Sequence, residues 1–325
     1  RLSGVGVSTV SRVLNKRPDV NEDTRGRVME VIERYGYEPN SNAKHLKQLS
    51  TDCVAVIVRG RNNLFFSGIL ELPQKRIEAA GLRFLPHYID ENDDEAAAAL
   101  RVYAERKVRG IIFMGGCHTD NGAMLSRLPI PCVYSTVNAA EGYAPNVSSV
   151  SVDDRQGAKK AVDYLFDCGH ENMVILSGET QGCNMAHQRY LGVLDSFKEH
   201  GKTLESSRVL VSPFSFSCAY ERIKEYTGPD YTAIFAMSDT MAIGAARALM
   251  DSGKRVPEDV SVIGYDGIEL AQYYHPALAT MRQPQQELAD RSVELLLESM
   301  DTDCAPKHIQ LETELIQGAS VKHIN

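Results

Sequence analysis

The sequence contains no apolar run approaching the roughly twenty residues of a membrane-spanning helix, and no charged-then-apolar leader. Its seven cysteines are scattered, without a Cys-x-x-Cys pair or clustered histidines. This spacing favours reduced, mostly buried thiols over a disulfide framework or a zinc site. We therefore expect a cytoplasmic protein that has no membrane partner.

Several common catalytic motifs are also absent. The chain has no Gly-x-Ser-x-Gly elbow, no Walker phosphate loop and no His-Glu-x-x-His helix. The glycine-rich run Met114-Gly115-Gly116 is too short to serve as a dinucleotide fingerprint. The sequence therefore gives no support to an enzyme, and it predicts no cofactor and no metal.

The charge is unevenly distributed along the 325 residues, although the net charge is −8. Residues 1–48 hold nine Lys or Arg against six Asp or Glu, a net charge of +3. The remainder, with 26 basic and 37 acidic residues, carries −11. A small basic head on an acidic body indicates nucleic-acid binding confined to one end. The length allows more than one core, so two or three domains are expected.

The run Val5–Asn15 has the pattern of an amphipathic helix. Val10, Val13 and Leu14 recur at helical spacing and predict one buried stripe. The opposite face carries mainly small hydroxyls, an amide and one guanidinium, from Val7, Ser8, Ser11, Arg12 and Asn15. Such groups enter a major groove without steric conflict, and Arg is the commonest bidentate reader of guanine. An ordinary amphipathic surface helix is the alternative interpretation.

The neighbouring residues favour a helix-turn-helix. Gly4 suits a tight turn before this helix, and Pro18 stops the helix after Asn15. A second helix follows, capped by Asn21 or Asp23. Its apolar stripe ends before a terminating glycine and consists of Val28, Val31, Ile32 and Tyr35.

The run from Gly4 to Asn15, followed by Val20–Arg25 and Gly36–Asn40, closely resembles the lactose-repressor/galactose-repressor family of bacterial transcription regulators. Members of that family carry several residues before the position of Arg1, so we expect a truncated first helix. We expect Val7, Ser8 and Arg12 to set the DNA sequence preference. The remaining recognition residues, Thr9, Ser11 and Asn15, are expected to contact phosphates.

Residues 39–50 form a polar stretch that composition alone assigns to a linker. In the resembled family it is a hinge helix that folds on operator DNA and inserts a leucine into the minor groove. Leu46 occupies that position, and Asn40, Ala43 and Lys44 match around it. A lone leucine flanked by lysines has the chemistry of an intercalating wedge.

From residue 51 the pattern changes to alternating strands and helices. Continuous apolar runs such as Cys53–Val58 are typical of parallel strands that are buried on both faces. The first round predicts strands 53–58, 84–89, 110–114 and 132–134, with helices 66–80 and 94–106. A second round from Val147 predicts strands 173–176, 208–211, 233–236 and 261–263, with helices 155–166, 188–200, 219–226 and 240–251.

These patterns predict an α/β protein with a small all-α helix-turn-helix head, residues 1–38, and a hinge helix or linker, residues 39–50. The core, residues 51–325, is expected to contain two doubly wound parallel sheets that resemble the periplasmic sugar-binding fold. The resemblance implies three crossings between lobes. The first lobe would comprise about 51–147 and 282–309, and the second about 148–281 and 310–325.

An effector site is expected where the carboxyl ends of the strands of both lobes face each other. The resemblance and the loop positions together select Phe65, Phe66, Thr136, Arg189, Phe214, Ser238 and Asp266. Phe66 is preferred to Phe65, Phe216 is an alternative to Phe214, and Asp239 is as well suited to capping a helix.

Two positions depart from the resembled family. Ser135-Thr136 stands where many sugar-binding members have an aspartate, and Gly318 replaces a common arginine. The first departure affects which sugar would fit, and the second affects local packing.

The resemblance implies a ligand-responsive repressor of sugar-utilisation genes that acts as a homodimer on double-stranded operator DNA and is nucleoid-associated when bound. Its effector would be a sugar or a sugar derivative, with nucleobases as the alternative. A solute-binding receptor of the same two-lobed fold is the competing interpretation. Such a receptor needs a signal peptide and no basic head, and this sequence has the reverse.

Overall fold

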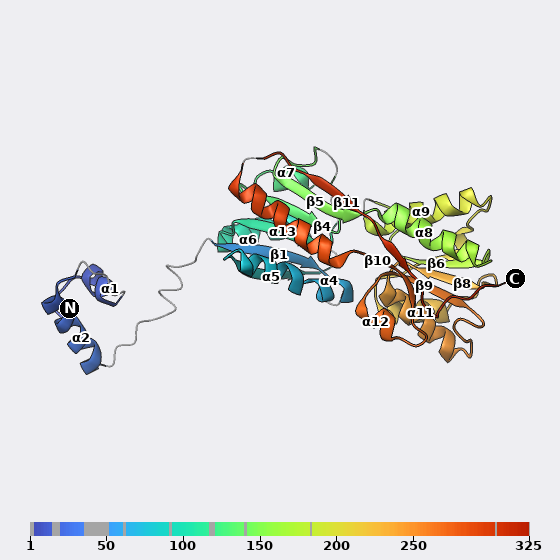
Figure 1. Ribbon diagram of the computed structural model, residues 1–325, viewed down its shortest axis with the longest axis horizontal. Coiled ribbons are helices and arrows are strands. Elements are labelled where there is room, and N and C mark those ends of the chain that lie inside the picture. The colour runs from blue at the N-terminus through green and yellow to red at the C-terminus, as the bar shows by residue number, and fades with distance from the viewer. Residues whose placement is uncertain are drawn as a thin grey trace. The chain divides into compact units, whose positions relative to one another are not determined.

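A computed structural model of the chain describes residues 3–14, 20–35, 52–60, 63–90, 93–116, 121–139, 142–182, 184–302 and 304–324 (Figure 1). The chain divides into two compact units, residues 1–50 and 51–325. We describe each unit by itself.

The first unit contains helices α1, Val7–Leu14, and α2, Glu22–Tyr35. The Asn21 side chain accepts a hydrogen bond from the Asp23 amide at 2.8 Å, so Asn21 is the cap of α2. Val13 and Val28 are buried together with Val20, which joins the two helices into one small core. The expected pair of helices is therefore present at the expected positions.

The first lobe of the second unit is built on a six-stranded sheet in the order β11-β5-β4-β3-β1-β2. All its pairings are parallel. The strands are β1 Cys53–Arg59, β2 Arg83–Ile89, β3 Gly110–Met114, β4 Cys132–Ser135, β5 Val147–Val152 and β11 His308–Leu311. The strands β3, β4 and β5 are buried throughout, as their continuous apolar or small-residue runs predict.

The second lobe has a six-stranded sheet in the order β12-β10-β9-β8-β6-β7. It is parallel except for β12, which runs antiparallel to β10. The strands are β6 Met173–Ser177, β7 Val209–Val211, β8 Ala233–Ala236, β9 Ser261–Asp266, β10 Ala279–Arg282 and β12 Glu314–Ile316. Two mostly parallel sheets in series confirm the predicted fold class.

Helices cover both sheets (Figure 1). The first lobe has α4 Leu64–Ile69, α5 Glu71–Ala79, α6 Glu95–Arg106, α7 Gly122–Leu125 and α13 Gln285–Asp301. The second lobe has α8 Asp154–Asp167, α9 Met185–Glu199, the 3₁₀ turn Ser206–Arg208, α10 Phe216–Lys224, α11 Asp239–Asp251 and α12 Glu269–Tyr273. The helices α8 and α9 pack as one pair and α10 and α11 as another.

One predicted helix, residues 66–80, is divided into α4 and α5 at Leu70. Pro73 explains the division, because proline has no amide hydrogen to donate to the Ile69 carbonyl one turn earlier. The backbone therefore restarts at Glu71, and α4 becomes a separate short helix beside the end of β1.

The chain crosses between the lobes after β5, after β10 and after β11. The strand Val147–Val152, where the sequence analysis began the second round, pairs within the first sheet, so the first crossing follows Val152. The helix α13 packs on α5 and on the strands of the first sheet, as the resemblance implied. Gly318 lies so close to the backbone of Ala277–Ala279 that a Cβ would meet the Ala277 carbonyl oxygen at 2.4 Å.

Candidate functional site

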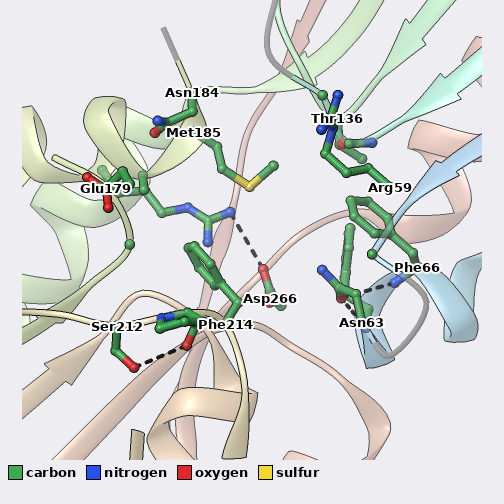
Figure 2. A pocket seen from close by; sticks show the side chains of 18 of the residues that line it. Arg59, Asn63, Phe66, Thr136, Glu179, Asn184, Met185, Ser212, Phe214 and Asp266 are labelled. Atoms are coloured by element: carbon green, nitrogen blue, oxygen red, sulfur yellow. Dashed lines mark hydrogen bonds and ion pairs between the residues drawn. The ribbon is translucent and has the colours of Figure 1, made fainter. Parts of the chain in front are cut away.

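A cavity of about 640 Å³ opens at the carboxyl ends of strands from both sheets (Figure 2). Six of the seven predicted effector residues line it: Phe65, Phe66, Thr136, Arg189, Phe214 and Asp266. The first three come from the first lobe and follow β1 and β4, and the others come from the second lobe. Segments that are separated by up to two hundred residues therefore meet at one site.

The first-lobe wall is set by the start of α4. The Asn63 side chain caps this helix by accepting hydrogen bonds from the amides of Phe65, at 3.0 Å, and Phe66, at 3.4 Å. The two rings lie edge to face with centroids 5.5 Å apart. Gly115 lies against Phe66, and a Cβ there would come within 2.8 Å of the ring. The glycine therefore leaves room for the aromatic wall.

Arg59, the last residue of β1, is a lining residue that the sequence analysis missed. Its Nη2 lies 2.7 Å from Oε2 of the buried Glu95, and the Tyr134 hydroxyl donates to Oε1 of the same carboxylate at 2.7 Å. A Cβ at Gly116 would meet Oε2 of Glu95 at 2.6 Å. One buried carboxylate thus holds the cationic end of the first-lobe wall in place.

Arg189, in the first turns of α9, is the cation of the second-lobe wall and is almost fully buried. Its Nε donates to Oδ1 of Asp154 at 2.8 Å, and its Nη1 donates to the Met237 carbonyl. Its guanidinium carbon lies 3.7 Å from the centroid of the Tyr265 ring, a cation–π arrangement. These contacts fix the direction in which Nη2 points into the cavity.

Asp266 ends β9 and lies 3.5 Å from Nη2 of Arg189, as the dashed line in Figure 2 marks. The Gln283 side chain also contacts this carboxylate, with Nε2 donating to Oδ1 at 2.8 Å. Burial raises the pKa of Asp266 to about 6, although the Arg189 charge and the Gln283 hydrogen bond oppose this shift. Its backbone φ of 114° lies in a region that non-glycine residues rarely adopt.

Phe214 follows β7 and covers the second-lobe side (Figure 2). A Cβ at Gly178 would meet the Phe214 ring at 2.4 Å, so the ring lies directly on the backbone after β6. The alternative, Phe216, is exposed at the start of α10 and does not line the cavity. Further lining groups that the sequence analysis missed are Asn63, Glu179, Asn184, Met185, Ser212 and Gln283.

Ser238, the seventh predicted residue, does not line the cavity. Its hydroxyl instead accepts the Met241 amide at 3.2 Å and caps α11. The expectation that Asp239 caps this helix is wrong, because Oδ2 of the buried Asp239 accepts the Ile268 amide at 2.8 Å. Ser238 is the cap because it is the residue immediately before the first helical turn, whereas Asp239 is already the first residue of α11 and lines no part of the cavity.

The predicted DNA-contacting residues fall on the first unit. Arg12 is exposed and Thr9 is half-buried in α1. The side chains of Val7, Ser8 and Ser11 lie outside the described part of the structure. So do Asn15, Asn40, Ala43, Lys44 and Leu46.

The described residues give little sign of other chemistry. Within them, no group of three His, Cys, Asp or Glu is placed to hold a metal ion. None of the described helices has the length and apolar character needed to cross a bilayer. The described cysteines are free thiols, of which Cys53, Cys132 and Cys168 are buried and Cys304 is exposed.

Comparison with known families gives two matches. Residues 1–40 match the family described as bacterial regulatory proteins, lacI family, and residues 162–321 match the periplasmic binding protein-like domain. The whole chain is 34% identical to the HTH-type transcriptional regulator MalR of Clostridium butyricum, covering 98% of that protein. It is 32% identical to the HTH-type transcriptional repressor PurR of Vibrio vulnificus, again covering 98%.

Solved structures of the same architecture are also similar. A transcriptional regulator CelR–cellobiose complex has 28% sequence identity and a TM-score of 0.73, with 98% of this chain and 97% of that chain covered. The lac repressor dimer bound to operator and the anti-inducer ONPF has 23% identity and a TM-score of 0.74, with coverage of 99% and 97%. At 23% identity, the similarity to the lac repressor concerns the fold alone.

Proposed function

Because this chain belongs to the LacI family of bacterial regulatory proteins and is a ligand-responsive transcriptional regulator, we propose that its effector is a small sugar or sugar derivative. The effector binds in the cavity between the lobes and alters the affinity of the head for double-stranded operator DNA. Residues 39–50 connect the two units and transmit the change. The regulated genes serve sugar utilisation, and the protein works in the cytoplasm, where its DNA lies.

One observation carries this proposal: six predicted effector residues from distant segments line a single cavity. The cavity combines aromatic walls, Phe66 and Phe214, with a guanidinium and a carboxylate, Arg189 and Asp266. Aromatic rings suit the C–H faces of a pyranose, while charged groups exchange hydrogen bonds with adjacent hydroxyls. The similar CelR structure with bound cellobiose supports a sugar. A purine also stacks on aromatic rings and is the alternative.

The experiment is a thermal-shift screen of the full chain against sugars, phosphorylated sugars and nucleosides, followed by calorimetry on the best ligand. A ligand that binds the native state raises its melting temperature by mass action. The Phe214→Ala variant is expected to bind that ligand at least about tenfold more weakly, from the loss of stacking worth roughly 0.5–1.5 kcal/mol and of buried apolar area. Equal affinity in parent and variant would place the effector elsewhere.

Arg12 is proposed as the base-reading residue of α1. Its exposed guanidinium on a helix of this type fits the bidentate edge of guanine. Replacing Arg12 by alanine is expected to cost about 1–3 kcal/mol and to relax specificity at one base pair. Competition binding with a library of operator variants measures the effect. A uniform weakening across all sequences would make Arg12 a phosphate contact instead.

We also propose that the working form is a homodimer formed through the core lobes, because two heads then match the two-fold symmetry of a palindromic operator. The short helix α12 exposes apolar side chains, with Tyr273 77% and Leu270 42% exposed. Sedimentation of the full chain at micromolar concentration is expected to give a dimer, and Tyr273→Asp is expected to shift it towards monomer. A monomeric parent in the presence of operator would reject the dimer.

A further inference from the structure

A second cavity, of about 220 Å³, adjoins the main one beside the crossings between the lobes. We call it the annex. First-lobe residues Thr136 and Asn138 lie on one side, and the start of α8 and of α9 lies on the other. Gln310 of β11 also lines it, so the annex is bounded by the strands that cross between the lobes. The resemblance that selected the effector residues named none of the annex residues except Thr136.

Met185 separates the two cavities. It lines both of them, together with Asn184 and Thr136. As the first residue of α9 it belongs to the second lobe, yet its side chain packs against the hydrophobic core of the first lobe, which includes Val137. Figure 2 shows the thioether reaching out from α9 into the space that faces Thr136. Of the three residues that line both cavities, Met185 is the one with a flexible, unbranched side chain.

The chemistry of the annex differs from that of the main cavity. Its described lining contains no aromatic side chain and presents the amides of Asn138, Gln188 and Gln310. Gln188 and Gln310 are exposed to solvent, and in the described part of the chain their side-chain amides make no hydrogen bond to protein. An amide supplies both donors and an acceptor, which matches hydroxyls that donate and accept.

The charged groups of the annex are already engaged by the protein. Asp153 caps α8 by accepting the Gln156 amide at 2.9 Å. Arg155 forms two hydrogen bonds with Asp195, at 2.5 and 2.9 Å. Asp154 accepts Nε of Arg189. The side-chain amides of Gln188 and Gln310, by contrast, have no protein partner among the described residues, and neutral amides suit an uncharged and hydroxyl-rich unit that needs no stacking surface.

We propose that the annex is a second sugar subsite, so that the effector consists of at least two linked sugar units with Met185 packed at their junction. This inference rests on the proposed sugar effector and deepens it. One unit lies between Phe66 and Phe214 in the main cavity, and the next exchanges hydrogen bonds with Gln188 and Gln310. Met185 limits the width of the passage and so determines the length of the sugar that is accepted.

The test is calorimetry of the full chain with glucose, maltose, cellobiose, maltotriose and cellotriose. The parent is expected to bind one of the disaccharides at least tenfold more tightly than glucose. The double substitution Gln188→Ala and Gln310→Ala is expected to abolish that preference while leaving the glucose affinity within twofold. The matched control is Gln156→Ala, because Gln156 is an exposed glutamine on α8 that lines neither cavity. This substitution is expected to change neither the glucose affinity nor the disaccharide affinity.

Met185→Ala provides an independent variant at a half-buried position. Opening the partition is expected to raise the ratio of trisaccharide to disaccharide affinity about tenfold. If the disaccharide preference survives the double substitution, or if glucose binds as tightly as both disaccharides, the annex is not a subsite and the sugar effector stands. If the parent binds none of these sugars, the annex subsite fails; if it also binds no sugar or phosphorylated sugar in the thermal-shift screen, the proposed sugar effector fails as well.

Discussion

Replacing Arg189 by methionine is expected to lower the free energy of unfolding by about 3–5 kcal/mol, because it leaves the carboxylates of Asp154 and Asp266 buried without their cation. The same change removes the guanidinium that faces the effector cavity, and the effector affinity is expected to fall by about a hundredfold. Urea unfolding of the full chain measures the first effect, and calorimetry measures the second.

Arg155→Met is the matched control. Arg155 also pairs with an aspartate, Asp195 of α9, but its side chain is 51% exposed and does not line the main cavity. Removing an exposed pair of this kind typically costs about 0–1 kcal/mol. If the two substitutions destabilised the protein equally, the buried cluster around Arg189 would not be the electrostatic centre of the second lobe.

Effector binding is expected to weaken in acid as Asp266 takes up a proton. Its pKa of about 6 lies above the ordinary value of 3.8, because burial disfavours the charged form. A sugar hydroxyl donates most strongly to the ionised carboxylate. Below pH 6 the ionised fraction falls by about tenfold for each pH unit, so the affinity at pH 5 is expected to be about a tenth of that at pH 7.

Acid has the opposite effect on folding stability: protonation of Asp266 weakens effector binding but favours the folded state. A carboxyl with a raised pKa favours the folded state while it is protonated, so this contribution is full below pH 4 and is lost as the pH rises through 6. The neighbours Asp154 and Asp239 also have pKa values raised by burial, and they act in the same direction. The Asp266→Asn variant is expected to flatten the pH profile of binding between 5 and 7. An unchanged profile in this variant would assign the titration to another group.

The sequence predicts most of the fold because the signals are local. Continuous apolar runs such as Ala233–Ala236 mark buried parallel strands, and Asp94, where the predicted helix 94–106 begins, caps α6. The location of the site is also predictable from a general rule. The loops that follow parallel strands all lie at the carboxyl edge of the sheet, and ligands bind there. Phe66, Arg189 and Asp266 all satisfy that rule.

The remaining features depend on contacts between distant residues. Nothing local in the sequence joins Arg59 to Glu95 and Tyr134, or places Met185 of the second lobe against the core of the first. The choice between Ser238 and Asp239 as the cap depends on a single position in the helix start. The strand β5 pairs with β4 and with β11, and β11 lies more than 150 residues later in the chain. This pairing keeps β5 in the first lobe, so the first crossing follows Val152.

We propose that a small molecule in the cavity between the lobes controls the DNA affinity of the head, which forms a separate unit. The most direct test is the operator affinity of the full chain, measured by fluorescence anisotropy with and without the best-binding sugar, in the parent and in Phe214→Ala. We predict that saturating sugar changes the operator affinity of the parent at least tenfold, and that the variant needs at least about tenfold more sugar for the same change. An operator affinity that the sugar leaves unchanged in the parent, or changes at the same concentrations in both proteins, would contradict this claim.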